Sequence, residues 1–189
     1  MKYLKLCVLF IFILFPLKLD ALIEVDITRG NLNPLPIAVS ALYADNDTIK
    51  LLKKEIKIDQ IGNEISKIIE NNLRATGLFN PLEKKAFLQK PDVAHLKPRF
   101  EDWSLIKAQA LITGKVEFKD DKVRVEFRLW DVLAAREMLA LAFTTVPNNW
   151  RRIGHIISDK IYERLTGEQG YFDTRIIFVS EEGPKTKRV

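Results

Sequence analysis

The sequence is poor in the side chains that most enzyme and metal sites need. It contains one cysteine, Cys7, and only two histidines, His95 and His155, in 189 residues. Cys7 lies inside an N-terminal apolar run that we expect to be removed, so the mature chain would have no disulfide, thiolate metal site or cysteine nucleophile. The sequence also lacks the GxxxxGK[ST] and GxGxxG phosphate-binding loops, the HExxH zinc motif and the GxSxG nucleophile elbow. These absences argue against an enzyme.

The first 21 residues have the parts of a secretory signal peptide. Lys2 and Lys5 precede an unbroken apolar run from Leu6 to Phe15, Pro16 interrupts it, and Ala21 is a small residue at which cleavage can occur. The run is shorter than the roughly 20 apolar residues that a membrane-spanning helix needs. We therefore expect cleavage after Ala21 and no stable membrane insertion afterwards; an uncleaved membrane anchor is the alternative.

The charge of the mature chain excludes one class of partner. Residues 1–21 contain three lysines and one aspartate, so their removal lowers the formal net charge from +5 to +3. The remaining basic side chains are interleaved with acidic ones, as in Lys53-Lys54-Glu55. No basic stripe with interspersed aromatic residues is present, so we expect no nucleic-acid partner.

The first half of the mature chain contains one clear helix. Residues 60–76 form an amphipathic helix with Asp59 before its first turn and Gly77 after its last. Its apolar face comprises Ile61, Ile65, Ile68, Ile69 and Leu73. We expect a buried strand over 37–42 before it and an exit strand or turn over 78–82 after it. The pattern does not assign a structure to 48–58, and 83–98 reads as a surface loop.

The second half predicts three strands followed by a second long helix. A short helix is expected after Asp102, and the strands cover 111–118, 123–130 and 136–146. Asp120-Asp121 forms the first turn, and Pro147 opens the helix, which Gly167 closes. The apolar face of that helix comprises Trp150, Ile153, Ile157, Ile161 and Leu165. These elements predict an α/β (α+β) fold, a mixed sheet of about five strands with two long helices on one face.

Few side chains are candidates for chemistry. His155 and Asp159 share a helical face, but two ligands are fewer than the four of a structural zinc site. We expect a local hydrogen bond there, no metal and no cofactor, and we expect His95 to be solvated. Trp103, Trp130 and Trp150 could stack on sugars, but such residues usually complete a small core.

The N-terminal end of the mature chain is the best candidate for binding. Ile23, Val25 and Ile27 alternate with Glu24, Asp26 and Thr28, which is the pattern of a strand or of a segment ready to become one. Such a segment can add a strand to the sheet of a partner. The alternative is that it belongs to the sheet of its own domain.

Several motifs in order resemble the TolB family. They are Gly77-Leu78-Phe79-Asn80-Pro81-Leu82, the stretch 110–116 after Trp103, the stretch 127–132, and a long block over 150–180 that includes Leu165-Thr166-Gly167-Glu168 and Thr174-Arg175-Ile176. The resemblance covers residues 22–189. It implies a non-enzymatic periplasmic protein of the Tol-Pal system, which supports outer-membrane integrity and constriction at cell division.

The resemblance also implies a partner site. The first residues of mature TolB proteins bind the C-terminal domain of TolA. The corresponding residues here are Leu22, Ile23, Glu24, Val25, Asp26 and Ile27.

The family fold has two parts, an N-terminal α/β domain and a β-propeller that binds Pal. We expect 1–21 to be the signal peptide, 22–170 the α/β domain and 171–189, with a strand over 174–180, the start of a truncated propeller. Only 17 residues follow Phe172, and one propeller blade needs about 40. Pal binding is therefore not expected of these 189 residues. A generic periplasmic domain that binds glycan or peptide in a Trp-lined groove, or a non-functional fragment, is the alternative.

Overall fold

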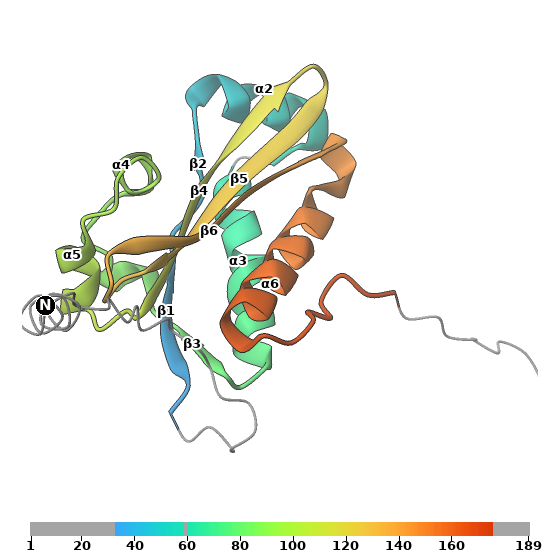
Figure 1. Ribbon diagram of the computed structural model, residues 1–189. Coiled ribbons are helices and arrows are strands. Elements are labelled where there is room, and N and C mark those ends of the chain that lie inside the picture. The colour runs from blue at the N-terminus through green and yellow to red at the C-terminus, as the bar shows by residue number, and fades with distance from the viewer. Residues whose placement is uncertain (1–32, 59, 176–189) are drawn as a thin grey trace, which may run out of the picture.

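The computed structural model describes residues 33–58 and 60–175. The segment 22–27, Asp59 and nearly all of the strand expected over 174–180 lie outside these ranges. The described chain forms one mixed sheet with helices on both sides (Figure 1).

The sheet confirms the expected mixed α/β class and has six strands. Its order is β3-β1-β4-β5-β6, with a two-residue strand, β2, that pairs with β4. The strands are β1 (Leu35–Val39), β2 (Tyr43–Ala44), β3 (Phe79–Pro81), β4 (Ala110–Lys119), β5 (Lys122–Asp131) and β6 (Arg136–Thr145). Strand β1 is parallel to both β3 and β4, whereas β4, β5 and β6 form an antiparallel meander.

The meander follows from period-two alternation and from its first turn. Val123, Val125, Phe127 and Leu129 are fully buried on one face of β5, while the residues between them are partly exposed on the other. Asp120 and Asp121 join β4 to β5 with φ values of 52° and 55°. Two consecutive left-handed residues make a hairpin turn whose twist matches that of the flanking strands. Sequence and structure agree on this hairpin.

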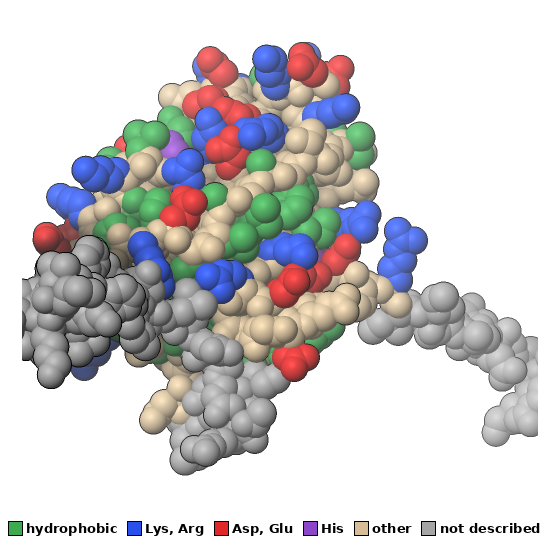
Figure 2. Space-filling view, in the orientation of Figure 1, with side chains coloured by type: hydrophobic (Ala, Val, Ile, Leu, Met, Phe, Trp, Pro, Cys, Tyr) green, Lys and Arg blue, Asp and Glu red, His purple; other side chains and the backbone are tan. Residues whose placement is uncertain are grey.

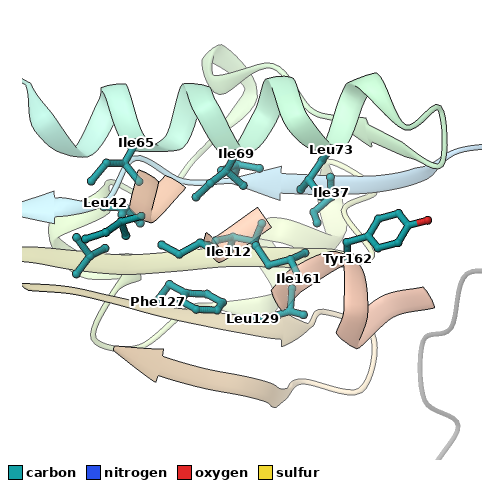
Figure 3. Close-up of a cluster of buried hydrophobic side chains, with 14 of the residues drawn as sticks. Ile37, Leu42, Ile65, Ile69, Leu73, Ile112, Phe127, Leu129, Ile161 and Tyr162 are labelled. Atoms are coloured by element: carbon teal, nitrogen blue, oxygen red, sulfur yellow. The ribbon is translucent and has the colours of Figure 1, made fainter. Parts of the chain in front are cut away.

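The two long helices lie side by side on one face of the sheet, as expected. They are α3 (Ile61–Ala75) and α6 (Trp150–Thr166), and η2 (Pro147–Asn149) leads into α6. Ile65, Ile69 and Leu73 of α3 and Ile161 of α6 point toward Ile112 and Phe127 of the sheet (Figure 3). Gly77 and Gly167, with φ values of 72° and 76°, end the helices in the left-handed conformation that favours glycine.

Residues 48–56 of the stretch 48–58, to which the sequence assigns no structure, belong to helix α2 (Asn46–Ile56). The Asp45 side chain accepts a hydrogen bond of 2.7 Å from the Thr48 amide and so caps the helix. This hydrogen bond holds the pKa of Asp45 below its ordinary value. The buried residues of α2 are Thr48 and Leu52. Ile49, Leu52 and Ile56 recur along it at helical spacing, so the apolar period was an available signal for this helix.

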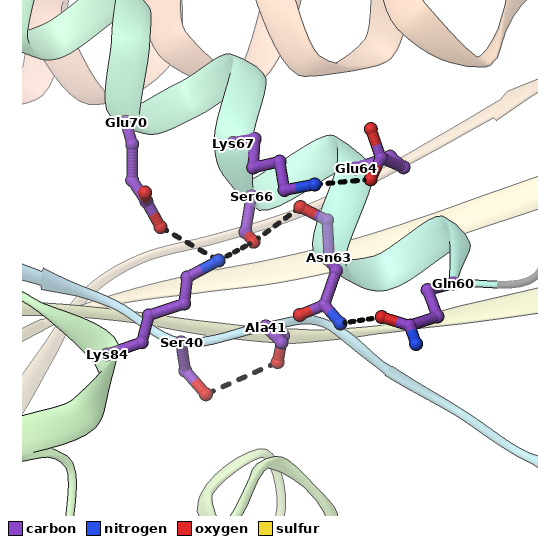
Figure 4. A network of polar contacts seen from close by, with 9 residues as sticks. All are labelled: Ser40, Ala41, Gln60, Asn63, Glu64, Ser66, Lys67, Glu70 and Lys84. Carbon is purple, nitrogen blue, oxygen red and sulfur yellow. Dashed lines mark hydrogen bonds and ion pairs between the residues drawn. The ribbon is translucent and has the colours of Figure 1, made fainter.

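The region 83–98 is more ordered than the surface loop expected from sequence. It contains η1 (Lys84–Ala86) and α4 (Pro91–Ala94), and Lys84 bridges to α3 through Ser66 and Glu70 at 2.6 and 2.9 Å (Figure 4). Buried Gln89 accepts from the Arg99 amide and the Trp103 indole, and its amide group donates to the Lys97 carbonyl. Two polar side chains, Lys84 and Gln89, therefore hold this region in place, and apolar patterning does not reveal such contacts.

The second face of the sheet carries a smaller apolar cluster. Helix α5 (Phe100–Leu105) begins before Asp102 rather than after it and places Trp103 against Ala38, Leu111 and Val132. Ala38 and Leu111 alternate along their strands with Ile37 and Ile112 of the main core. Strands β1 and β4 are therefore buried on both faces, which explains their nearly continuous apolar sequence.

Leu165 offers a test of the main core. Its side chain is fully buried on α6, so Leu165→Ala should lower the free energy of unfolding by about 2–5 kcal/mol. Urea denaturation measures the change as a lower midpoint. Leu105→Ala is the matched control, because Leu105 is 74% exposed and its truncation should change stability by less than about 0.5 kcal/mol. Equal midpoints for the two variants would contradict the packing described for α6.

Candidate interaction site

The segment expected to bind a partner lies outside the described residues. Leu22, Ile23, Glu24, Val25, Asp26 and Ile27 precede the first described residue, Asn33. Both the strand expected there and its role in binding remain predictions. The structure does describe the strand into which this segment leads.

Strand β1, into which this segment leads, is an interior strand of the sheet. Leu35 pairs with Phe79 of β3, and the Leu35 amide donates a hydrogen bond of 2.9 Å to the Leu78 carbonyl. On the other side, Ile37 pairs with Ala110 of β4. Because β1 has a neighbour on each side, the chain that precedes it begins at an interior strand of the rigid domain.

Near the end of the described chain, residues 170–173 are held against α6 by the carboxylate of Asp159. We call these residues the exit. One Asp159 oxygen accepts from the Phe172 amide at 2.6 Å, and the other accepts from the Asp173 amide at 3.1 Å. Gly170 passes so close to α6 that an added Cβ would lie 2.4 Å from the Asp159 Cα. The turn after Gly167 is therefore held along α6 by its backbone.

Side chains strengthen this exit. Arg152 donates two hydrogen bonds of 3.0 Å to the Asp173 carboxylate, one to each oxygen. These bonds hold the pKa of Asp173 below its ordinary value and raise the pKa of Arg152. The rings of Tyr171 and Phe172 pack on Tyr162 at 5.5 and 6.0 Å between ring centroids, and burial raises the pKa of Tyr171. The exit thus combines apolar packing with an exposed ion pair.

The histidines do not form a metal site within the described ranges, where no cluster of three or more His, Cys, Asp or Glu side chains occurs. His155 Nδ1 lies 2.9 Å from the Asn72 amide nitrogen, which also donates to Ser158 at 2.9 Å and so links α3 to α6. The local His155–Asp159 hydrogen bond expected from sequence is therefore wrong, since each side chain has another partner. His95 is not simply solvated, because its ring stacks on Tyr43 at 4.5 Å.

The tryptophans serve the core, as expected. Trp103 and Trp150 are buried, and Trp130 donates a hydrogen bond from its indole to Thr113 at 2.9 Å while its ring packs against Phe100. Two of the three indoles are therefore unavailable to a sugar or peptide. This arrangement does not favour a Trp-lined groove as a binding site.

A comparison with known families decides the family of this domain. Residues 23–138 match the model of the TolB amino-terminal domain. The chain belongs to the TolB amino-terminal domain family. The match covers strands β1 to β5 and helix α3. It also includes the segment 23–27, which precedes the described residues.

Two relatives extend this finding. The chain is 73% identical over 179 residues to the Tol-Pal system protein TolB of Pelagibacter ubique (strain HTCC1062), which covers 95% of this chain and 40% of that protein. The chain thus spans less than half the length of this relative. The crystal structure of TolB from Acinetobacter baumannii superposes with a TM-score of 0.59 at 23% identity, over 79% of this chain and 33% of that one. This likeness confirms the fold.

The TolB family domain described here is a closed α/β body with a defined entry and exit. Between residues 33 and 175, apart from 59, no helix has the length and apolar character to cross a bilayer. The long block of family resemblance over 150–180 has a physical basis in the described part, because Gly167, Gly170, Phe172 and Asp173 all serve the exit along α6.

Sequence reasoning missed the residues that organise these features. The spacing of four residues between His155 and Asp159 suggests a hydrogen bond between them. In the fold, the carboxylate oxygens of Asp159 instead accept hydrogen bonds from backbone amides 13 and 14 residues later. Asn72 and Ser158 are 86 residues apart. A polar residue on the apolar face of each long helix was the available signal for that pair.

Gly170 tests whether the exit depends on close approach to α6. Gly170→Ala places a methyl group within 2.4 Å of the Asp159 Cα, so the backbone must move and should lose the two amide hydrogen bonds to Asp159. We expect a destabilisation of about 1–3 kcal/mol and faster hydrogen exchange at the amides of Phe172 and Asp173. Hydrogen exchange followed by NMR measures both amides.

Gln169→Ala is the matched control, since Gln169 is exposed in the same turn. Its Phe172 and Asp173 amides should keep their parental exchange rates. Unchanged exchange in the Gly170→Ala variant would contradict the geometry of the exit.

Proposed function

We propose that this chain is a periplasmic binding module of the Tol-Pal system. Segment 22–27 links it to the C-terminal domain of TolA, and through this link it supports outer-membrane integrity and constriction at cell division. The observation that carries the proposal is the 73% identity to a protein named Tol-Pal system protein TolB. The proposal extends a role to this chain from a relative of which it spans 40%.

The sequence of segment 22–27 supports the choice of binding site. Its apolar residues alternate with Glu24 and Asp26, so an extended conformation has one apolar row and one acidic row. Main-chain hydrogen bonds to the edge of a partner sheet supply affinity, and the side chains of alternate residues supply specificity. The segment leads into β1, whose two neighbouring strands hold the body of the domain rigid behind it.

The expected domain layout is part of the proposal. Residues 1–21 direct export and are removed, 22–170 form the α/β module, and 171–189 are the start of a truncated β-propeller. The module acts by binding rather than by catalysis. The histidines and tryptophans of the described residues support that view, because they have structural partners within the fold.

The export step predicts a defined mature N-terminus. The apolar run 6–15 and Ala21 favour cleavage after residue 21. N-terminal sequencing of the periplasmic fraction should therefore read Leu22-Ile23-Glu24. Recovery of chains that begin at Met1 in the membrane pellet would refute this part of the proposal.

Val25→Asp tests the partner site. If Val25 docks against the TolA domain, the substitution places an uncompensated charge in the contact, which costs several kcal/mol. A loss of about 3 kcal/mol is more than a hundredfold in affinity. Isothermal titration calorimetry with the TolA C-terminal domain measures the affinity, and a melting curve should show little change in the stability of the variant.

Val93→Asp is the matched control for this substitution. Val93 lies in α4 and is 51% exposed, so the same change there should leave both affinity and melting temperature near their parental values. Equal affinity of Val25→Asp and the parent would place the TolA site elsewhere. A large fall in the melting temperature of Val25→Asp would instead assign the segment to the sheet of its own domain.

A further inference from the structure

Strand β6 is a long outer edge of the sheet. It has ten residues, and among the residues that the structure describes it pairs only with β5. The opposite edge, β3, has three residues and includes Pro81, which lacks an amide donor. Short edges and prolines prevent unwanted strand pairing, so the two edges differ in how well they are protected.

The features that protect β6 from pairing with another strand lie at its start. Arg136 and Glu137 are charged, and the register shift opposite Leu129 and Trp130 leaves Met138 as a bulge. Arg164 of α6 donates a hydrogen bond of 3.2 Å to the Met138 carbonyl. Charge, bulge and a capping side chain therefore end the available edge at Met138.

The rest of β6 carries no such device. From Met138 to Trp150 the sequence contains no charged residue, and between Leu139 and Thr145 it contains no proline or glycine. Ala140, Leu141 and Ala142 are exposed. In Figure 2, hydrophobic and neutral side chains, rather than charged ones, follow the middle of this strand. The available edge is thus seven residues long and uncharged.

The side chains of this edge form two distinct rows. Leu139, Leu141 and Phe143 lie on the core side, since they pair with Leu129, Phe127 and Val125 of β5. Leu141 is nevertheless 37% exposed. Ala140 and Ala142 form a row of small residues on the other side. A strand that paired with this edge could pack its own apolar side chains against the row of Leu139, Leu141 and Phe143. The small side chains of Ala140 and Ala142 would not obstruct that strand.

We propose that β6 pairs with β6 of a second copy of this chain, antiparallel and about a two-fold axis at Leu141. In this register Leu139 lies opposite Phe143 of the second copy, and Ala140 lies opposite Ala142. Glu137 lies opposite Thr145, so no like charges meet. The edge is complementary to itself in length, charge and position of its apolar row, as a two-fold interface requires. This inference does not depend on the proposed function.

Sedimentation velocity of the mature chain over a range of concentrations tests the proposal. The parent should shift from monomer to dimer as concentration rises. Leu141→Lys places two lysines opposite each other at the axis and should weaken dimerisation roughly tenfold or more. Leu133→Lys is the matched control, because Leu133 is 70% exposed in the turn after β5 and lies off the edge; it should dimerise like the parent.

Two further variants guard against a folding defect and locate the axis. Ala142→Lys pairs with Glu126 on β5 and keeps the fold, yet it places a charge on the edge and should also weaken the dimer. In the mature chain, from which Cys7 has been removed, Leu141→Cys should form an intermolecular disulfide under mild oxidation, since directly opposite residues lie at disulfide distance. Leu133→Cys should not.

Each outcome decides the matter. A dimer that crosslinks through Leu141→Cys and is weakened by both lysine variants on β6 supports the proposal. A chain that stays monomeric at all concentrations overturns it, as does a dimer that ignores Leu141→Lys and fails to crosslink at position 141. Binding of the TolA domain through segment 22–27 is unaffected by either result, so failure of this inference is distinguishable from failure of the proposed function.

Discussion

The burial of the apolar faces of α3 and α6 against one face of the sheet is the interaction on which the rest of this structure depends. Ile65, Ile69 and Leu73 meet β1 and β4, and Ile157, Ile161 and Leu165 of α6 belong to the same core. The helices also hold each other, through the hydrogen bond from Asn72 to Ser158. This packing positions β1, where the chain enters, and the outer surface of α6, along which it leaves.

Regular patterns in the sequence predicted the parts of the fold whose burial is periodic. Both long helices and the β4–β5 hairpin follow from apolar spacing and from residues suited to left-handed turns, such as Asp120, Asp121 and Gly167. Helix α2 was not predicted, although Ile49, Leu52 and Ile56 recur in it at helical spacing. The path of 83–98 was not predicted either, because it depends on the ion pair of Lys84 with Glu70 and on the buried amide of Gln89, which bonds to three separated groups. Such bonds are set by tertiary position rather than by local sequence.

The candidate site at 22–27 is a prediction that comes from family resemblance. Alternation in 22–27 indicates a strand, but alternation alone does not distinguish a strand of the domain from a strand offered to a partner. The match of 23–138 to the TolB amino-terminal domain supplies the family. Inferences from spacing alone did less well: the pair His155 and Asp159 suggested a shared bond, and the fold gives each of them a different partner.

The central proposal is that the N-terminal segment 22–27, rather than the α/β body, contacts the partner. The most direct test is an NMR titration of the isotope-labelled chain with the TolA C-terminal domain, which reports on every amide at once. The account predicts that the largest shifts fall on residues 22–27, while the amides of α3, α6 and β4 keep their positions. Large shifts across α3 and α6 with none in 22–27 would contradict it.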